Sequence, residues 1–265
     1  MKCDLLRQKL STDLVERLRE AINSFELAQG GLNGKATVGR PLLEAAPGSP
    51  EYNSAFDLIS WFWDSGLDGE FEARYGNPPV LLTPFCTIRR HLATERTTHV
   101  DWHLDANFVG FGGDFAVFWV PVDPVGKDRP GLDFYIPKGQ YRLSEVSQRW
   151  NSLPIVDGGR TLDDAGIETF FGSVPARRAS PELNPGDVLL FNELVPHRTQ
   201  RMETITRDRT AIEFRVTSRQ RPVPRHPVFG ARLVATKAPG EGIRLTPANE
   251  FFASQSRSCG DGITS

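Results

Sequence analysis

From Pro79 onward the chain consists of short stretches that are apolar or alternate between apolar and polar residues, with Gly, Pro or Asp between them. These stretches are Val80–Leu82, Phe85–His91, Phe115–Val122, Leu132–Ile136, Asp187–Asn192 and Thr210–Ser218. Runs of this length bounded by turn residues are typical of β-strands. Many short strands bury their apolar faces when they close into a barrel or stack as a sandwich, so we expect one of these two cores.

The residues before Pro79 have helical periodicity instead. A first helix is predicted over Thr12–Gln29, capped at Ser11 or Thr12. Its apolar residues recur at helical spacing: Leu14, Leu18, Ile22 and Phe25. A second helical region starts near Pro50 and is rich in aromatic side chains, which indicates packing against a sheet. Membrane contact is the less favoured alternative, because the run is interrupted by Asp57, Asp64 and Asp68.

We therefore expect a mainly β protein with flanking helices (α+β) in a single domain of 265 residues. Two small domains would also fit this length, but all-β barrels of this size are often single. The expected parts are a helical region 1–78 packed on the barrel, a core 79–219 with a loop-and-helix insertion at about 140–166, and a partly mobile C-terminal extension 220–265.

Charge and cysteine content restrict the partners and the compartment. The net charge of -2 and the pI near 6.2 provide no basic field for nucleic acid or an anionic membrane. No apolar run approaches the ~20 residues that span a bilayer, and the N-terminal residues lack the apolar region of a signal peptide. Cys3, Cys86 and Cys259 are far apart and odd in number, as in a reducing compartment. We expect a cytoplasmic protein with no nucleic-acid partner and no membrane partner.

The sequence Trp102-His103-Leu104-Asp105 is the first candidate for a metal site. A histidine and an aspartate two residues apart on an extended segment point to the same side. A glycine-rich sequence follows, and such a loop can leave a metal accessible. However, a His-x-Asp pair also occurs by chance, and a single histidine is more often structural than a ligand.

His197 is the candidate for a third ligand. It follows a predicted turn at Pro185-Gly186-Asp187 and a predicted buried strand, and it lies just beyond the end of that strand. Alone, this histidine would fit an exposed loop; together with the first pair it favours a ligand. Two imidazoles and one carboxylate fill one face of a metal ion and leave the other open, as in non-haem Fe(II) oxygenases.

Arg209 opens the predicted strand that follows His197. In strand geometry Arg209, Ala211, Glu213 and Arg215 share one face, and the opposite face is mostly apolar. The planar guanidinium of Arg209 is suited to a bidentate contact with a carboxylate. Taken alone, this strand face also fits a solvent-exposed surface with a pair between Glu213 and Arg215.

The remaining histidines are weaker ligand candidates than His103 and His197. His99 would share a strand face with His103, and His91 alternates with Thr87 on its own strand. His226 lies in a loop rich in Pro and Arg, where we expect it to be exposed.

Four segments form a combined pattern that is more specific than any one of them. They are Trp102–Asp105, similar to W-H-x-D; Phe118–Asp123 with Gly131 and Leu132, a strand and turn; Pro185–His197, leading to the second histidine; and Arg209–Ile212, similar to R-x-A-[IL]. Together they resemble the phytanoyl-CoA dioxygenase family of Fe(II)/2-oxoglutarate oxygenases, over about half of the chain, from Phe85 to Ser218. The resemblance implies a double-stranded β-helix (jelly-roll, cupin-like) core.

The same resemblance implies a role for particular residues. His103, Asp105 and His197 would bind Fe(II). Arg209 would bind the distal carboxylate of 2-oxoglutarate, and Thr199 would donate its hydroxyl to the same carboxylate. Arg215 would lie just outside the metal ligands.

The implied reaction converts 2-oxoglutarate and O2 to succinate and CO2 while an unactivated C–H bond of a small molecule is oxidised. The substrate could be a biosynthetic intermediate. Related halogenases have a small residue where this chain has Asp105, so the carboxylate favours hydroxylation, desaturation or ring formation.

The substrate itself is not implied by the resemblance. Where the family often has P-G-S-H, this chain has Pro137-Lys138-Gly139-Gln140, a departure next to the expected substrate entrance. Six residues could line the pocket, although each also fits a structural role: Arg89, Arg90, Asn107, Phe108, Trp119 and Glu193. The region before Pro79 has no such resemblance.

Two other functions remain open from the sequence. One is a metal-dependent cupin-type enzyme that does not use 2-oxoglutarate, which would have no need for Arg209 and Thr199 beside the metal. The other is a non-catalytic barrel that serves as a binding module, which would be expected to lack at least one ligand.

Overall fold

The structure is a computed structural model that describes residues 3–32, 34–94, 99–109, 115–138, 143–153, 161–172, 174–218 and 233–258. Its helices are α1 Thr12–Ala28, α2 Gly39–Glu44, α3 Pro50–Asp64, α4 Leu67–Tyr75, α5 Ala106–Val109, α6 Leu143–Asn151, α7 Asp164–Phe171 and α8 Ala248–Ser258, with a 3-10 turn η1 at Thr83–Phe85. None of these described helices is long and apolar enough to cross a membrane.

The strands form two sheets. The larger sheet contains β1 Cys3–Leu6, β2 Lys35–Thr37, β3 Pro79–Leu81, β4 Thr87–His91, β5 Phe115–Pro121, β8 Val188–Asn192, β10 Arg209–Ser218, β11 Leu233–Lys237 and β12 Ile243–Pro247. The smaller sheet has the order β7-β6-β9, with β6 Leu132–Pro137, β7 Ala176–Ala179 and β9 His197–Thr199. Neighbouring strands pair antiparallel in both sheets.

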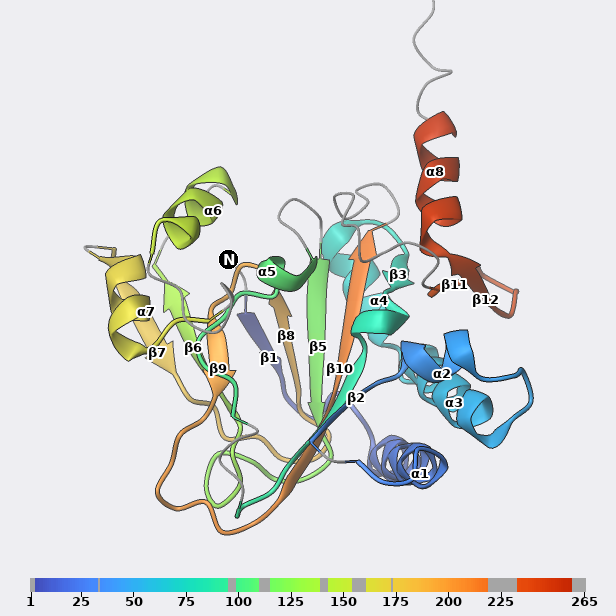
Figure 1. Ribbon diagram of the computed structural model, residues 1–265, viewed down its shortest axis with the longest axis horizontal. Coiled ribbons are helices and arrows are strands. Elements are labelled where there is room, and N and C mark those ends of the chain that lie inside the picture. The colour runs from blue at the N-terminus through green and yellow to red at the C-terminus, as the bar shows by residue number, and fades with distance from the viewer. Residues whose placement is uncertain are drawn as a thin grey trace, which may run out of the picture.

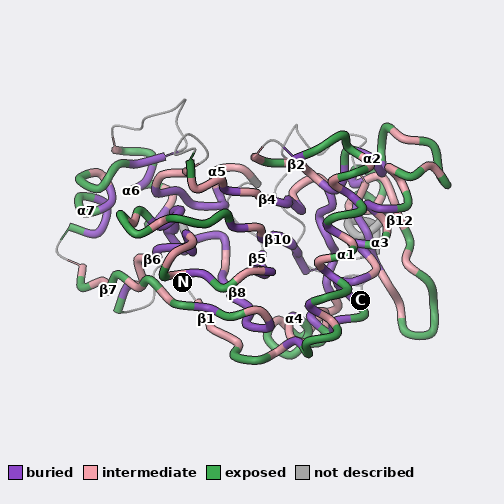
Figure 2. Tube along the Cα trace, turned by 90° about the horizontal axis from the view of Figure 1, so that it is seen from below, coloured by how far each residue is buried: buried purple, intermediate pink, exposed green. Residues whose placement is uncertain are grey.

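The larger sheet is covered on one side by the N-terminal helices, and α6 and α7 lie on the side of the smaller sheet (Figure 1). Figure 2 shows the buried segments concentrated in the strands between these helices. The expectation of an α+β protein with a β core and flanking helices is confirmed.

Strand β10 shows how the sequence produces these layers. Its residues Ile212, Phe214 and Val216 point to the helix side, where they join one apolar core with α1 and α3. Trp61 of α3 stacks on Phe214 with ring centroids 5.7 Å apart, and its indole N–H donates to the Leu14 carbonyl of α1 at 2.9 Å. The aromatic-rich helix predicted near Pro50 therefore packs on the sheet, as expected.

The opposite face of the larger sheet looks toward the smaller sheet. It is apolar toward β8 and β1, where Phe191 packs edge-on against Phe134 of β6 with centroids 5.3 Å apart. Toward β10 and β4 the same face becomes polar, and it carries Arg209, Glu213 and Arg215. Charged side chains are buried between two sheets when they have ionic or metal partners, so this region is where a site is expected.

All the strands predicted from the sequence are present within one or two residues of the expected bounds, as is the first helix. The strands β1 and β2 were not predicted in the N-terminal region, because each is short and is ordered by its pairing, with β8 and β4 respectively. Val146 and Trp150 of the expected insertion are buried, as the helical pattern indicated.

The C-terminal extension contains more structure than its sequence suggested. The hairpin β11–β12 adds to the edge of the larger sheet at β3, and α8 continues through Ser258, within the extension that was expected to be partly mobile. The Pro/Arg-rich residues 221–230, with His226, lie outside the described residues.

Candidate metal and cosubstrate site

His103 and His197 are joined by their backbones. His103 forms a bridge with His197 of β9, in which the N–H of each residue donates to the carbonyl of the other, at 3.0 and 3.1 Å. Their imidazole rings consequently lie side by side, with centroids 4.1 Å apart. The two histidines, far apart in the sequence, are thus placed together by sheet pairing.

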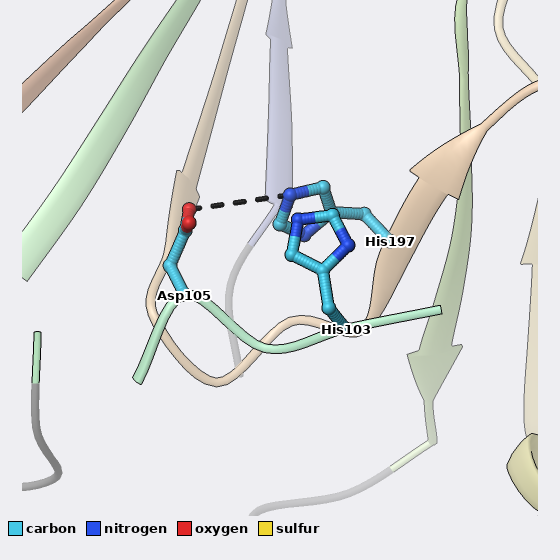
Figure 3. Close-up of side chains that lie close together, drawn as sticks. All are labelled: His103, Asp105 and His197. Atoms are coloured by element: carbon cyan, nitrogen blue, oxygen red, sulfur yellow. Dashed lines mark ion pairs between the residues drawn. The ribbon is translucent and has the colours of Figure 1, made fainter. Parts of the chain in front are cut away.

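Asp105 completes the group. It follows His103 by two residues, and its Oδ2 lies 4.0 Å from Nε2 of His197 (Figure 3). One candidate ligand atom from each of the three residues lies within 4.8 Å of the others, and all three residues are buried. The arrangement predicted from the sequence is therefore present, and these residues could hold a metal ion.

The protonation of both histidines suits metal binding. Nδ1 of His103 lies 2.8 Å from the Asp101 carbonyl, and Nδ1 of His197 lies 3.0 Å from the Val195 carbonyl. A carbonyl accepts a hydrogen bond, so Nδ1 carries the proton and Nε2 keeps its lone pair. Burial, followed by the neighbouring His197, lowers the pKa of His103 to about 3, and burial also lowers the pKa of His197. Both rings are neutral at pH 7.

The carboxylate of Asp105 has one occupied and one open oxygen. Oδ1 accepts a hydrogen bond from Nη2 of Arg215 at 2.8 Å, whereas the buried Oδ2 has no hydrogen-bond partner among the described residues. Burial favours the neutral acid, but the charge of Arg215 outweighs it and holds the pKa of Asp105 below its usual value. Buried carboxylate oxygens normally have a partner. A divalent cation held by Asp105, His103 and His197 would supply one, so the residues fit a metal.

Arg215 belongs to a buried ionic network. It pairs with Glu213 at 2.8 Å as well as with Asp105, and Glu213 in turn accepts hydrogen bonds from Arg89 at 3.0 Å and from the Thr87 hydroxyl at 2.8 Å. Of the two alternatives for this strand face, the solvent-exposed one is wrong. The pair between Glu213 and Arg215 exists, but it lies inside the protein, because the smaller sheet covers this face.

Arg209 lies on the same face of β10 and is 1% exposed. Its Nε and Nη1 have no hydrogen-bond partner among the described residues, and its guanidinium carbon lies 5.2 Å from the ring centroid of Trp119. Burial without a directly bonded carboxylate lowers the pKa of Arg209 to about 9. A buried guanidinium with open donors is costly unless an anion binds it, so this residue is ready to receive a carboxylate.

Thr199 and His91 are also buried. Thr199 is buried, and its hydroxyl accepts a hydrogen bond from the Val100 N–H at 3.2 Å, which leaves the hydroxyl proton available for donation. His91 is opposite Arg209 in the pairing of β4 with β10, so it shares the face of Arg209. His91 was ranked below His103 and His197 as a ligand candidate, because spacing alone does not indicate which residue lies opposite it on the neighbouring strand.

The six candidate substrate residues are distributed unevenly. The ring of Phe108 lies 5.7 Å from that of His103, Trp119 lies under Arg209, and Arg89 reaches the ionic network. Glu193 is buried, and its carbonyl accepts from the Ala106 N–H, while Asn107 directly follows in α5. Arg90, in contrast, points to the helix side and pairs with Glu26 of α1, so the structure does not bring it to the triad.

A second ionic network lies on the side of β9 that faces away from the triad. Arg198 follows His197 and therefore points away from it; the side chain is buried, binds Asp133 at 2.9 Å and Asp164 at 2.6 Å, and stacks over Trp102 at 4.6 Å. The indole of Trp102 donates to Asp164 at 2.8 Å. This cluster ties the His103 and His197 segments to β6 and α7. Because neighbouring residues on a strand face opposite sides, the sequence could have indicated that Arg198 lies on the face away from His197.

Comparison with known proteins supports the fold. No family model matches this chain. The non-haem α-ketoglutarate-dependent carbocyclase SnoK of nogalamycin biosynthesis is similar with a TM-score of 0.59 at 14% identity, over 92% of this chain and 91% of SnoK. The epimerase SnoN, in complex with Fe3+, α-ketoglutarate and nogalamycin RO, gives 0.56 at 16% identity, over 91% and 86%. EctD from S. alaskensis with bound Fe gives 0.55 at 14% identity, over 82% and 73%.

Identities this low show a shared fold. The α+β architecture with large antiparallel sheets is thus consistent with the double-stranded β-helix of non-haem iron, 2-oxoglutarate-dependent oxygenases, as predicted. The predicted resemblance to these oxygenases is confirmed at the level of the fold and of the buried His-x-Asp…His triad.

Proposed function

We propose that this chain is an Fe(II)- and 2-oxoglutarate-dependent oxygenase that oxidises an unactivated C–H bond of a small molecule. His103, Asp105 and His197 are the proposed ligands. The observation that carries the proposal is the pair of open groups in one buried interior: Oδ2 of Asp105, beside two neutral imidazoles, and the donors of Arg209. A metal satisfies the first and a dicarboxylate cosubstrate satisfies the second.

Each residue has a separate task in this proposal. The two histidines present Nε2, because their Nδ1 protons are held by backbone carbonyls. Arg215 orients the carboxylate of Asp105 so that one oxygen stays free. Arg209 binds the distal carboxylate of 2-oxoglutarate, with Thr199 as a further donor. When bound, iron supplies the reaction with O2 that side chains cannot perform, and the protein supplies orientation and a site shielded from water.

The kind of oxidation that we propose rests on Asp105 and on the solved structures with a similar fold. Asp105 occupies the position that a halide would need, which favours hydroxylation, desaturation or ring formation. SnoK is a carbocyclase, SnoN is an epimerase, and EctD has been solved with 5-hydroxyectoine, so similar folds serve more than one outcome. Among these, hydroxylation of a small natural product or solute is the reaction that we propose for this chain.

The test separates the site from the substrate. Purified protein is loaded with Fe(II) under nitrogen, its iron content is measured, and 2-oxoglutarate binding is followed by calorimetry. We expect about one iron per chain, and 2-oxoglutarate binding that Arg209→Ala weakens by about 2–5 kcal/mol. Succinate formation is then measured in air with a cell extract as the source of substrates. Mass spectrometry of the same reaction identifies the product by an added oxygen. Iron binding without 2-oxoglutarate binding would instead favour a cupin-type enzyme, and binding of neither would favour a non-catalytic module.

A further inference from the structure

The polar face of the larger sheet carries more positive than negative charge. Strand β2 pairs with β4, and β4 with β10, so Lys35 is opposite Arg89 and Arg89 is opposite Ala211. Residues opposite each other in antiparallel strands share a face. On β2, β4 and β10 this face therefore holds four cationic side chains and one carboxylate: Lys35, Arg89, Arg209 and Arg215, with Glu213.

Three of these cations have a partner in the site or a task there. Arg215 is paired with Asp105 and Glu213, and Arg89 is paired with Glu213 through Nε. Arg209 is assigned to the cosubstrate carboxylate. Lys35 is different, because it makes no side-chain hydrogen bond or ion pair to the residues that the structure describes.

Lys35 lies at the rim of this face. Arg209 and Arg215 are deeply buried, the side chain of Arg89 is 16% exposed, and Lys35 is exposed. Charge thus continues from the interior to solvent on one face of the sheet. Like charges directly opposite each other on neighbouring strands are destabilising. The pair of Lys35 and Arg89 costs stability, and the described residues offer no compensating partner for Lys35.

Lys35 is within electrostatic reach of the triad. Desolvation of the amine, followed by the charge of Arg89, lowers the pKa of Lys35 to about 8, whereas Glu213 and Asp105 act in the opposite direction. The ammonium is therefore still largely charged at pH 7.

The bound groups of the proposed function do not change this balance. Fe(II) adds two positive charges and 2-oxoglutarate adds two negative charges. When Asp105 is counted with Glu213, the four cations still face two carboxylates. This face keeps an excess of positive charge, and it reaches solvent at Lys35.

We propose that Lys35 and Arg89 bind an anionic group of the substrate, a carboxylate or a phosphate, at the entrance of the site. This inference rests on the proposed function and names the class of substrate that it takes. Arg89 uses Nε for Glu213, and its terminal nitrogens make no hydrogen bond to the described residues, so they can grip two oxygens of one anion. Lys35 adds a mobile charge in front of them, which also attracts the substrate from solution.

The test uses three ring compounds that differ in one group: benzoate, phenyl phosphate and benzamide. Their binding to the protein loaded with Fe(II) and 2-oxoglutarate is measured by calorimetry under nitrogen, so that no turnover occurs. We expect one of the anions to bind at least about tenfold more tightly than neutral benzamide, which corresponds to about 1.4 kcal/mol. The tighter of the two identifies the group as a carboxylate or a phosphate.

Variants at Lys35 test whether this residue causes the preference for anions over benzamide. Lys35→Met should remove most of the preference without changing benzamide binding, and Lys35→Arg should restore it. The matched control is Lys127→Met, since Lys127 is also exposed but pairs with Glu182. Equal binding of all three compounds, or an anion preference that survives Lys35→Met, would overturn the inference.

The same titrations distinguish this inference from the proposed function. If 2-oxoglutarate does not bind, the proposed function is wrong, and the titrations are repeated on protein without it. An anion preference that depends on Lys35 in that protein would still support an anion site at the rim, whereas its absence would refute both.

Discussion

Arg215 and Asp105 form a contact that sets the geometry of the proposed metal site. Nη2 of Arg215 donates to Oδ1 of Asp105 at 2.8 Å, and Oδ2 of the same carboxylate remains without a partner, 4.0 Å from Nε2 of His197. The guanidinium therefore occupies one oxygen and leaves the other for a metal. This predicts that Asp105 binds iron through one oxygen.

Replacing any one of the three proposed ligands should abolish turnover. His103→Ala, Asp105→Ala and His197→Ala each remove one of three ligands, so iron should be lost while the fold stays near intact, because none of the three side chains belongs to the apolar cores. Iron content and far-UV circular dichroism check the two parts. A variant that keeps more than a few per cent of turnover with added Fe(II) would show that its residue is not a ligand.

The two buried arginines should differ in what they support. Arg209→Ala should weaken 2-oxoglutarate binding by about 2–5 kcal/mol, because it leaves a carboxylate unpaired in a partly dry site. Arg215→Ala should weaken this binding less, but should lower the free energy of unfolding by about 3–5 kcal/mol, since Asp105 and Glu213 then lose their shared counter-charge. Calorimetry and urea unfolding measure the two effects. If Arg215→Ala weakened 2-oxoglutarate binding more than Arg209→Ala does, the assigned roles of the two arginines would be exchanged.

Asp105→Gly should not convert the protein into a halogenase. The change opens a position beside the histidines, but it also leaves Arg215 without one of its carboxylates, and a halide needs a shaped, hydrogen-bonding pocket. We expect weak iron binding and consumption of 2-oxoglutarate that is not coupled to product. Incubation with chloride or bromide and the native substrate checks this, and efficient formation of a halogenated product would contradict it.

His91 should make the fold less stable in mild acid. Burial, followed by Arg209 and Arg89, lowers its pKa from 6.5 to about 2. The unfolded chain binds a proton at His91 as the pH falls below its ordinary pKa, whereas the folded chain does not until the pH approaches the lowered value. Stability is therefore lost as the pH falls through this range. From about pH 7 to about pH 5.5, His91→Gln should lose roughly 1 kcal/mol less than the wild type.

Urea unfolding of both proteins at the two pH values measures this difference. Other carboxylates and histidines contribute equally to both proteins, so the comparison isolates His91. Parallel pH dependences of the two proteins would show that His91 is protonated in the folded chain as well.

Local pattern was sufficient for the longer strands of the core and for the candidate ligands. Apolar or alternating runs identified β4, β5 and β10, and the spacing of His103 and Asp105 placed both on one side of an extended segment. Residue spacing does not show which distant strands pair. Such pairing places His91 opposite Arg209 and Lys35 opposite Arg89. The burial of the charged face of β10, which the sequence alone also allowed to be exposed, likewise depends on distant parts of the chain.

The short elements were not predicted, because they also depend on pairing between distant strands. Strand β1 consists of four residues whose order comes from β8, and the hairpin β11–β12 is fixed by its contact with β3. Neither has enough periodicity of its own. Arg90 was grouped with Arg89 because the two are adjacent, but neighbours on a strand face opposite sides, and only Arg89 faces the interior that contains the triad.

The alternation of β10 makes the register of this strand critical. One set of its side chains packs against Trp61 and Phe62 of α3, and the other set forms the ionic face with Arg209 and Arg215. A shift by one residue would exchange the two sets and place Phe214 among the charges. A single-residue insertion or deletion within the strand would therefore damage the core and the site together, whereas length changes are tolerated better in the loops on either side of it.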